Sequence, residues 1–174
     1  MRKTKKLTLS AIMTALGVVF LSLGSAVELL DFVTCIFASV IMLFIYIEVG
    51  SPFTWLTWLT TALLCYLFFP ASFVWLNYLL AFGLYPIVKA YIEKLPKMLW
   101  LLMKLVYVNA VIWALIFLYD LIFGVPLLGL DKLWLKIVAY VVINIGFLAY
   151  DIFLTLAVRL YLVKYRHRFA RFLK

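Results

Sequence analysis

Charged side chains are confined to a few short segments of this chain, and the stretches between those segments are long and apolar. Only 13% of the 174 residues are charged, whereas 69% are hydrophobic. A soluble domain has about 25% charged residues, because its surface must be polar. The composition therefore excludes a cytoplasmic enzyme, a secreted disulfide scaffold and a disordered tail, and it indicates a membrane protein with several spans.

The formal net charge of +9 carries topological information, because Lys and Arg beside a span stay on the cytoplasmic side. Basic residues concentrate at 2–6, at 89–104 and at 159–174, and four of the seven acids lie in the intervening gaps. This alternation predicts that both termini are cytoplasmic. The basic segments would also attract the anionic headgroups of the lipid bilayer, and no nucleic-acid partner is expected.

The apolar stretches predict an all-α polytopic membrane protein with six transmembrane helices, folded as a single integral membrane domain over residues 1–174. The chain is expected in the plasma membrane of a prokaryote. The turn Glu48-Val-Gly-Ser-Pro52 has no basic residue, which makes it the weakest point of this topology. The expected spans are about 7–25, 30–49, 53–69, 73–88, 98–123 and 133–163.

Catalytic motifs are missing from the sequence. The single histidine, His167, lies in the basic tail, and neither a Gly-x-Ser-x-Gly elbow nor a phosphate-binding glycine loop is present. Asp120 and Asp151 are expected at different depths, which disfavours a paired-aspartate protease. Cys35 and Cys65 each lie alone in a span and are expected to fill space as small apolar residues. We therefore expect no enzyme activity, no catalytic residue, no metal and no cofactor.

The first span carries small residues on two faces. Ala11 and Ala15 are four residues apart, and Gly17 and Gly24 are seven apart. Small residues let helix backbones approach closely, which is how helices associate in lipid. The glycine face could serve internal packing. The alanine face has two open interpretations, packing against another span of this chain or docking onto a partner membrane protein.

Polar side chains in the outer halves of the last three spans indicate a binding site. Such side chains are unfavourable in lipid, so they usually face the bundle interior or a wet cavity. One helical face of the fifth span and one of the sixth carry most of them. The candidate substrate-binding residues are Asn77, Trp113, Asp120, Lys136, Tyr140 and Asn144.

Each of these positions also has a purely structural interpretation. Asn77 and Asn109 could make interhelical hydrogen bonds, and Trp113 could pack as an ordinary core residue instead of stacking on a flat ligand. Lys136 could extend to the headgroups and Asp120 could be an interfacial loop acid. Alternatively, this acid and this lysine could pair with each other or hold a zwitterionic ligand.

Asp151 is expected nearer the inner side of the membrane. A lone carboxylate there is unfavourable, so we expect it to have a basic partner. Lys104 should lie at a comparable depth, and Arg159 lies two turns further along the same helix. The sequence leaves both pairings open.

The chain resembles the substrate-binding S components of energy-coupling factor (ECF) transporters. The resemblance rests on six expected spans, cytoplasmic ends, a basic start and the segment Lys5-Lys-Leu-Thr-Leu-Ser-Ala11-Ile-Met-Thr-Ala15-Leu-Gly. The stretch Thr61-Ala-Leu-Leu-Cys-Tyr-Leu-Phe-Phe-Pro70 is also similar to the family's third span and the proline turn after it.

The resemblance implies a specific function. S components bind a vitamin or a similar trace nutrient near the outer face, and they dock on a transmembrane coupling subunit driven by two cytoplasmic ATPases. Ala11 and Ala15 would form the docking face. An alternative is a cell-envelope scaffold resembling the small shape-determining protein MreD, in which the same face would dock a morphogenetic partner.

Overall fold

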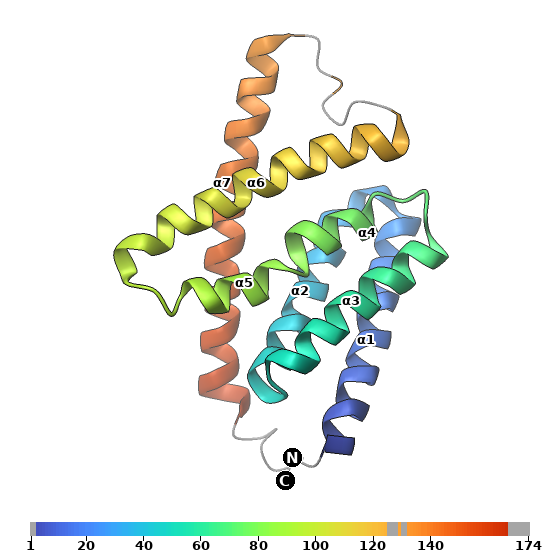
Figure 1. Ribbon diagram of the computed structural model, residues 1–174, viewed down its shortest axis with the longest axis vertical. Helices are drawn as coiled ribbons and strands as arrows, with labels where there is room; N and C mark the ends of the chain where they lie inside the picture. Colours follow the sequence, from blue (N-terminus) through green and yellow to red (C-terminus); the bar gives the residue numbers. More distant parts are fainter. Residues whose placement is uncertain (1–2, 125–128, 130–131, 167–174) are drawn as a thin grey trace. The chain divides into compact units, whose positions relative to one another are not determined.

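The computed structural model describes residues 3–124, 129 and 132–166, and these residues form helices and turns without any strand (Figure 1). His167 and the basic residues after it lie outside the described residues. The all-α prediction is confirmed for the described part of the chain. The elements are α1 (Lys3–Ala26), η1 (Glu28–Leu30), α2 (Asp31–Glu48), α3 (Ser51–Phe68), α4 (Val74–Asn77), η2 (Tyr78–Phe82), α5 (Tyr85–Ile92), α6 (Lys97–Phe123), α7 (Leu133–Leu160) and η3 (Tyr161–Tyr165).

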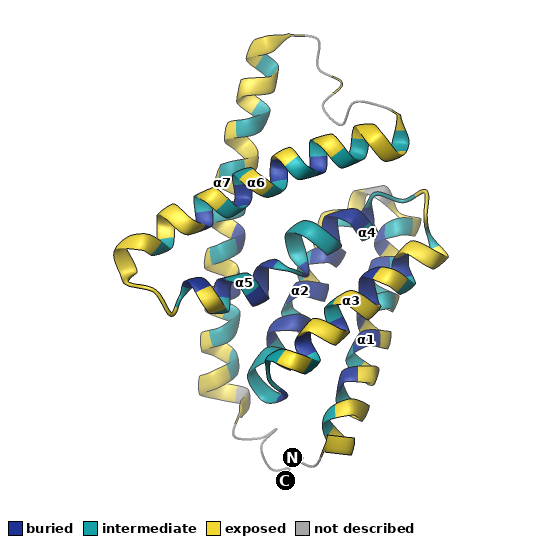
Figure 2. Ribbon diagram, viewed as in Figure 1, coloured by how far each residue is buried: buried dark blue, intermediate teal, exposed yellow. Residues whose placement is uncertain are grey.

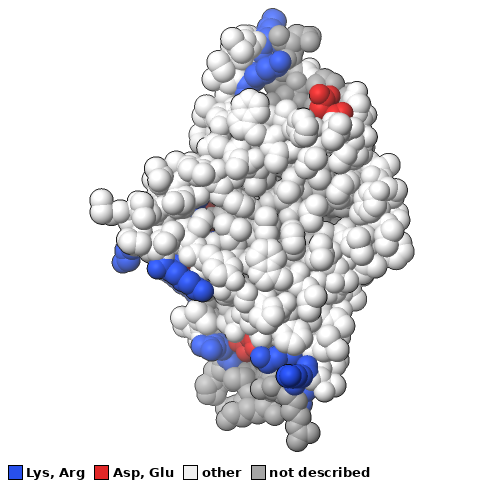
Figure 3. All heavy atoms as spheres, in the orientation of Figure 1, with Lys and Arg blue, Asp and Glu red and all other residues white. Residues whose placement is uncertain are grey.

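Four helices within the described residues are long and apolar enough to cross a membrane. They are α1, α2, α6 and the continuous helical stretch Leu133–Lys164. Many residues along these helices are exposed (Figure 2), and large apolar side chains are prominent among them. Uncharged residues make up most of the surface seen in Figure 3. An apolar surface of this extent is suited to contact with lipid.

The expected spans 53–69 and 73–88 do not correspond to any of these four helices. The first corresponds in position to α3, whose Thr and Trp side chains make it less apolar. The second is divided into α4, the π-helical turn η2 and α5. Pro86 contributes to this division, because it has no N–H to donate to the carbonyl of Phe82 four residues earlier.

Gly83 marks the point at which the helix is interrupted. Its N–H donates to the Tyr78 carbonyl at 2.7 Å, five residues back, which is the π-helical pattern. The Trp58 indole donates to the Leu79 carbonyl at 3.0 Å in the same turn. A Cβ atom at position 83 would come within 2.7 Å of the Tyr78 ring and 2.9 Å of Trp58, so only glycine fits here.

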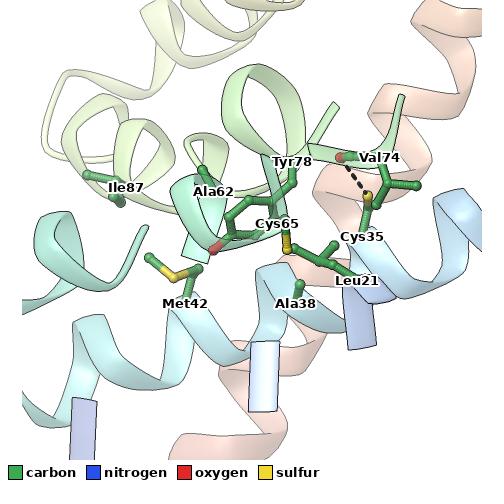
Figure 4. Packing of buried hydrophobic residues seen from close by; sticks show 9 residues of the cluster. All are labelled: Leu21, Cys35, Ala38, Met42, Ala62, Cys65, Val74, Tyr78 and Ile87. Atoms are coloured by element: carbon green, nitrogen blue, oxygen red, sulfur yellow. Dashed lines mark hydrogen bonds between the residues drawn. The ribbon is translucent and has the colours of Figure 1, made fainter. Parts of the chain in front are cut away.

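The chain divides into two compact units, one of residues 1–88 with 152–174 and the other of residues 89–151. In the first unit α1 packs against both α2 and α3. The core of this unit is a buried cluster that contains both cysteines, and the Cys35 thiol donates weakly to the Val74 carbonyl at 3.9 Å (Figure 4). The cluster comprises Leu21, Cys35, Ala38, Met42, Ala62, Cys65, Val74, Tyr78 and Ile87.

The glycine face of α1 makes the internal contacts of this unit. Gly17 and Gly24 are buried. A Cβ at Gly17 would lie 3.3 Å from Thr61 Cγ2 of α3, and one at Gly24 would collide with Thr34 of α2. The predicted use of the glycines in internal packing is confirmed.

The turn after α2 lies at the same end of the first unit as the start of α1 and the end of the C-terminal helix (Figure 1). Lys6 Nζ donates to the Val49 carbonyl at 3.1 Å. The Tyr161 hydroxyl donates to Glu48 Oε1 at 2.8 Å, and Arg166 Nε lies 3.8 Å from that oxygen. The turn therefore receives positive charge from distant parts of the chain, although it has no basic residue of its own.

Candidate docking groove and buried polar clusters

A groove lies on the first unit between the first half of α1 and α3. It has a volume of about 300 Å³. Ala11 and Ala15 line it and are exposed, so the described helices of this chain leave the alanine face open. We call this feature the α1–α3 groove. Its lining residues are Leu7, Ser10, Ala11, Thr14, Ala15, Phe53, Leu56, Thr57, Thr60 and Leu64.

The groove contains four hydroxyl groups with different hydrogen bonding. Thr14 Oγ1 donates to the Ser10 carbonyl at 2.9 Å, and Thr60 Oγ1 donates to the Leu56 carbonyl at 2.6 Å. The hydroxyls of Ser10 and Thr57 are buried and have no hydrogen-bond partner within the described residues. Ser10 is 6% exposed and Thr57 is 2% exposed. Two buried hydroxyls of the groove wall are thus unsatisfied.

The second unit contains a largely buried cluster of four charges, formed by Lys89, Glu93, Lys104 and Asp151. Lys104 Nζ lies 2.7 Å from Asp151 Oδ2 and 3.3 Å from Glu93 Oε1. Lys89 Nζ lies 2.8 Å from the same Glu93 oxygen and pairs with Asp151 Oδ1. We call this arrangement the four-charge cluster. It joins the end of α5, the turn after it, α6 and α7.

Burial makes this cluster important for stability. The side chains of Lys89 and Lys104 are 4% and 8% exposed and that of Asp151 is 13% exposed, whereas that of Glu93 is 33% exposed. Two positive and two negative charges compensate one another, which a buried ion requires. The Lys104 ammonium also lies 5.7 Å from the centre of the Trp100 ring, a cation–π distance. The cluster is therefore an internally satisfied ionic network.

The pairing of Asp151 with Lys104 is one of the two that the sequence left open, and the structure confirms it. Lys89 and Glu93 were not anticipated as members of the cluster, because the expected fourth span ends at residue 88. Their spacing of four residues was the available signal, since side chains at i and i+4 are neighbours on a helix. The helix α5 continues through Ile92, which brings the two together.

A polar triad joins α6 and α7 in the second unit. The Tyr140 hydroxyl donates to Asn109 Oδ1, and Asn144 Nδ2 lies 3.5 Å from the same oxygen. Both amides also donate to carbonyls of their own helices, Asn109 to Leu105 at 2.7 Å and Asn144 to Tyr140 at 3.0 Å. The interhelical hydrogen bond proposed for Asn109 is present. Two candidate binding residues, Tyr140 and Asn144, are brought together here.

The other candidate binding residues are not gathered around this triad. Trp113 is 68% exposed, and Asp120 and Lys136 are exposed as well. Asp120 and Lys136 make no ion pair with each other in the described part of the chain. Asn77 is buried on α4 in the first unit. Their shared role in ligand binding remains a prediction.

Metal-binding side chains do not cluster in the described residues. Within 3–124, 129 and 132–166, no group of three His, Cys, Asp or Glu side chains could hold a metal ion.

The chain matches no family model, no curated protein and no solved structure. No relative therefore assigns a function to the groove, the four-charge cluster or the triad.

Proposed function

We propose that this chain is a membrane-embedded, small-molecule-binding subunit of a multi-component ATP-driven importer, and that it docks on its partner through the α1–α3 groove. The observation that carries the proposal is the exposure of Ala11 and Ala15 on the wall of this groove. The glycine face of the same helix is used internally, so the alanine face is available to another helix. Small side chains there permit close backbone approach.

The resemblance to S components supplies the identity of the proposed partners. They would be a transmembrane coupling subunit and two cytoplasmic ATPases, and the ligand would be a vitamin-like micronutrient. The polar triad of Asn109, Tyr140 and Asn144 offers amide and phenol groups to such a ligand. Binding would exchange some of the triad's internal hydrogen bonds for bonds to the ligand.

The docking proposal is tested by filling the groove. The double variant Ala11→Trp, Ala15→Trp should lose co-purification with the coupling subunit and lose uptake. Thermal stabilisation by a panel of candidate vitamins should remain, because the triad lies in the other unit. Leu16→Trp is a matched control, since Leu16 is an exposed apolar residue of α1 that does not line the groove and lies on another face of the helix.

Two results would contradict the proposal. Unchanged co-purification in the double variant would mean that the groove is not the docking surface. Loss of vitamin binding together with docking would indicate that the alanines serve the internal packing of the chain. Both results are compared with the wild-type protein and the Leu16→Trp control.

The exposure of Trp113, Asp120 and Lys136 favours a second candidate function, a scaffold resembling MreD. Three of the six candidate binding residues are exposed, and a scaffold does not need a ligand site. In that case the groove would hold a morphogenetic membrane protein. Proteins that co-purify with the full chain discriminate between the two: a coupling subunit with ATPases supports the importer, and cell-wall machinery supports the scaffold.

A further inference from the structure

The unsatisfied hydroxyls of Ser10 and Thr57 set a chemical requirement for whatever fills the α1–α3 groove. Both side chains are more than nine-tenths buried and line the groove. Neither hydroxyl has a hydrogen-bond partner within the described residues, and both oxygens are buried, so each would turn toward the groove by rotation about χ1. A buried hydroxyl without a partner is unfavourable, and hydrocarbon offers it none. A groove filled by lipid chains alone would therefore leave both hydroxyls without a hydrogen-bond partner.

We infer that the groove receives a transmembrane helix of the partner that presents an uncharged hydrogen-bonding side chain, such as Ser, Thr, Asn or Gln, to Ser10 and Thr57. This inference rests on the proposed docking function and specifies the chemistry of the partner. The occupant is a helix because helices satisfy their own backbone groups in lipid. Its polar residue is uncharged because the groove wall carries no charge.

The remaining walls fit the same occupant. Leu7, Phe53 and Leu56 provide apolar contacts around the hydroxyls, and the small Ala11 and Ala15 let the incoming backbone come close. Small residues with a nearby polar group are typical of helix interfaces in membranes. The groove thus combines close packing with one polar contact.

The position of Ser10 sets the register of the incoming helix. Ser10 lies seven residues from the first residue of α1, which corresponds to about 10 Å along the helix axis. Thr57 lies at a similar distance from the start of α3. These two helix starts are at the same end of the unit, because Lys6 bonds to Val49. The polar residue of the partner should therefore lie about two turns from that end.

The inference predicts opposite effects on the isolated chain and on the complex. Removing the hydroxyls with Ser10→Ala and Thr57→Val should leave the stability of the isolated chain unchanged or raised, because neither hydroxyl is hydrogen-bonded to any described residue. The same change should weaken helix docking. Thr14→Val is the matched control, since the Thr14 hydroxyl lines the groove but already donates to the Ser10 carbonyl.

The test uses two synthetic probes and the full chain in phosphatidylcholine vesicles. Both probes are leucine-based transmembrane peptides with a Gly-x-x-x-Gly face, and one carries Asn where the other carries Ala. Binding is measured by energy transfer. The Asn peptide should bind wild type about three- to tenfold more tightly than the Ala peptide. This ratio should fall close to one in the Ser10→Ala, Thr57→Val variant and persist in Thr14→Val.

The outcomes separate this inference from the docking proposal. Equal binding of both peptides to wild type, or no binding of either, overturns the inference. If the Ala11→Trp, Ala15→Trp variant still loses the coupling subunit, the docking function stands without it. If that variant binds both peptides normally, the groove is not their site and the inference fails. Dimers of the chain that the Trp variant disrupts would also overturn it, by making a second copy the occupant.

Discussion

The four-charge cluster and the α1–α3 groove differ in whether their buried polar groups have partners within the described residues. In the cluster, each charge contacts two opposite charges of the same chain. In the groove, the hydroxyls of Ser10 and Thr57 are buried without a partner in the described residues. Satisfied groups hold helices of one chain together, whereas an unsatisfied group next to an open face needs an explanation, and the partner helix that we infer supplies one. The comparison therefore separates the polar residues of the internal packing from those that our proposal assigns to docking.

Removing Asp151 should produce the largest change in stability. Asp151→Asn leaves two buried ammonium groups with only Glu93 to compensate them. Removing one partner from a buried ionic network lowers the free energy of unfolding by about 3–5 kcal/mol. Unfolding of the full chain in detergent micelles measures the change, with Asp120→Asn at an exposed position as the control. Equal effects of the two variants would show that the cluster contributes little.

A smaller loss is expected for Gly83→Ala, which tests close packing in the first unit. The new methyl group would meet the Tyr78 ring at 2.7 Å and Trp58 at 2.9 Å. Overpacking of this kind costs about 1–3 kcal/mol. Gly146→Ala is the control, because a Cβ at that position meets nothing within 4 Å. A wild-type melting temperature for Gly83→Ala would mean that the η2 turn shifts without strain.

The smallest stability change is expected in the groove. Ser10→Ala and Thr57→Val should each alter the unfolding free energy of the isolated chain by about 0.5 kcal/mol or less, or stabilise it, because an unsatisfied hydroxyl is removed. The same micelle assay applies. A clear destabilisation would place these hydroxyls in the same structural class as the four-charge cluster, and the comparison would lose its basis.

Sequence patterns predicted the helical class, the internal use of Gly17 and Gly24, and the pairing of Asp151 with Lys104. These features depend on composition, on small side chains at helical spacing and on the high energy of a lone buried charge. The additional partners Lys89 and Glu93 were missed because their interaction requires α5 to continue past residue 88.

Other features could not be read from the sequence. The π-helical turn near Gly83 depends on contacts with Trp58 in another helix, and tertiary contacts of this kind have no local signal. The sequence also left the alanine face of α1 open between internal packing and docking. Which face is covered depends on how α2 and α3 pack against α1, and Ala11 and Ala15 are exposed in the result.

The most direct test of the docking claim is photo-crosslinking in living cells. A photoreactive phenylalanine analogue replaces Ala15 in one variant and Leu16, which is exposed on another face of α1, in a second variant. The docking account predicts a cross-link to the transmembrane coupling subunit from position 15 and only to lipid from position 16. Cross-links from position 15 that reach lipid alone, or only the chain itself, would contradict it.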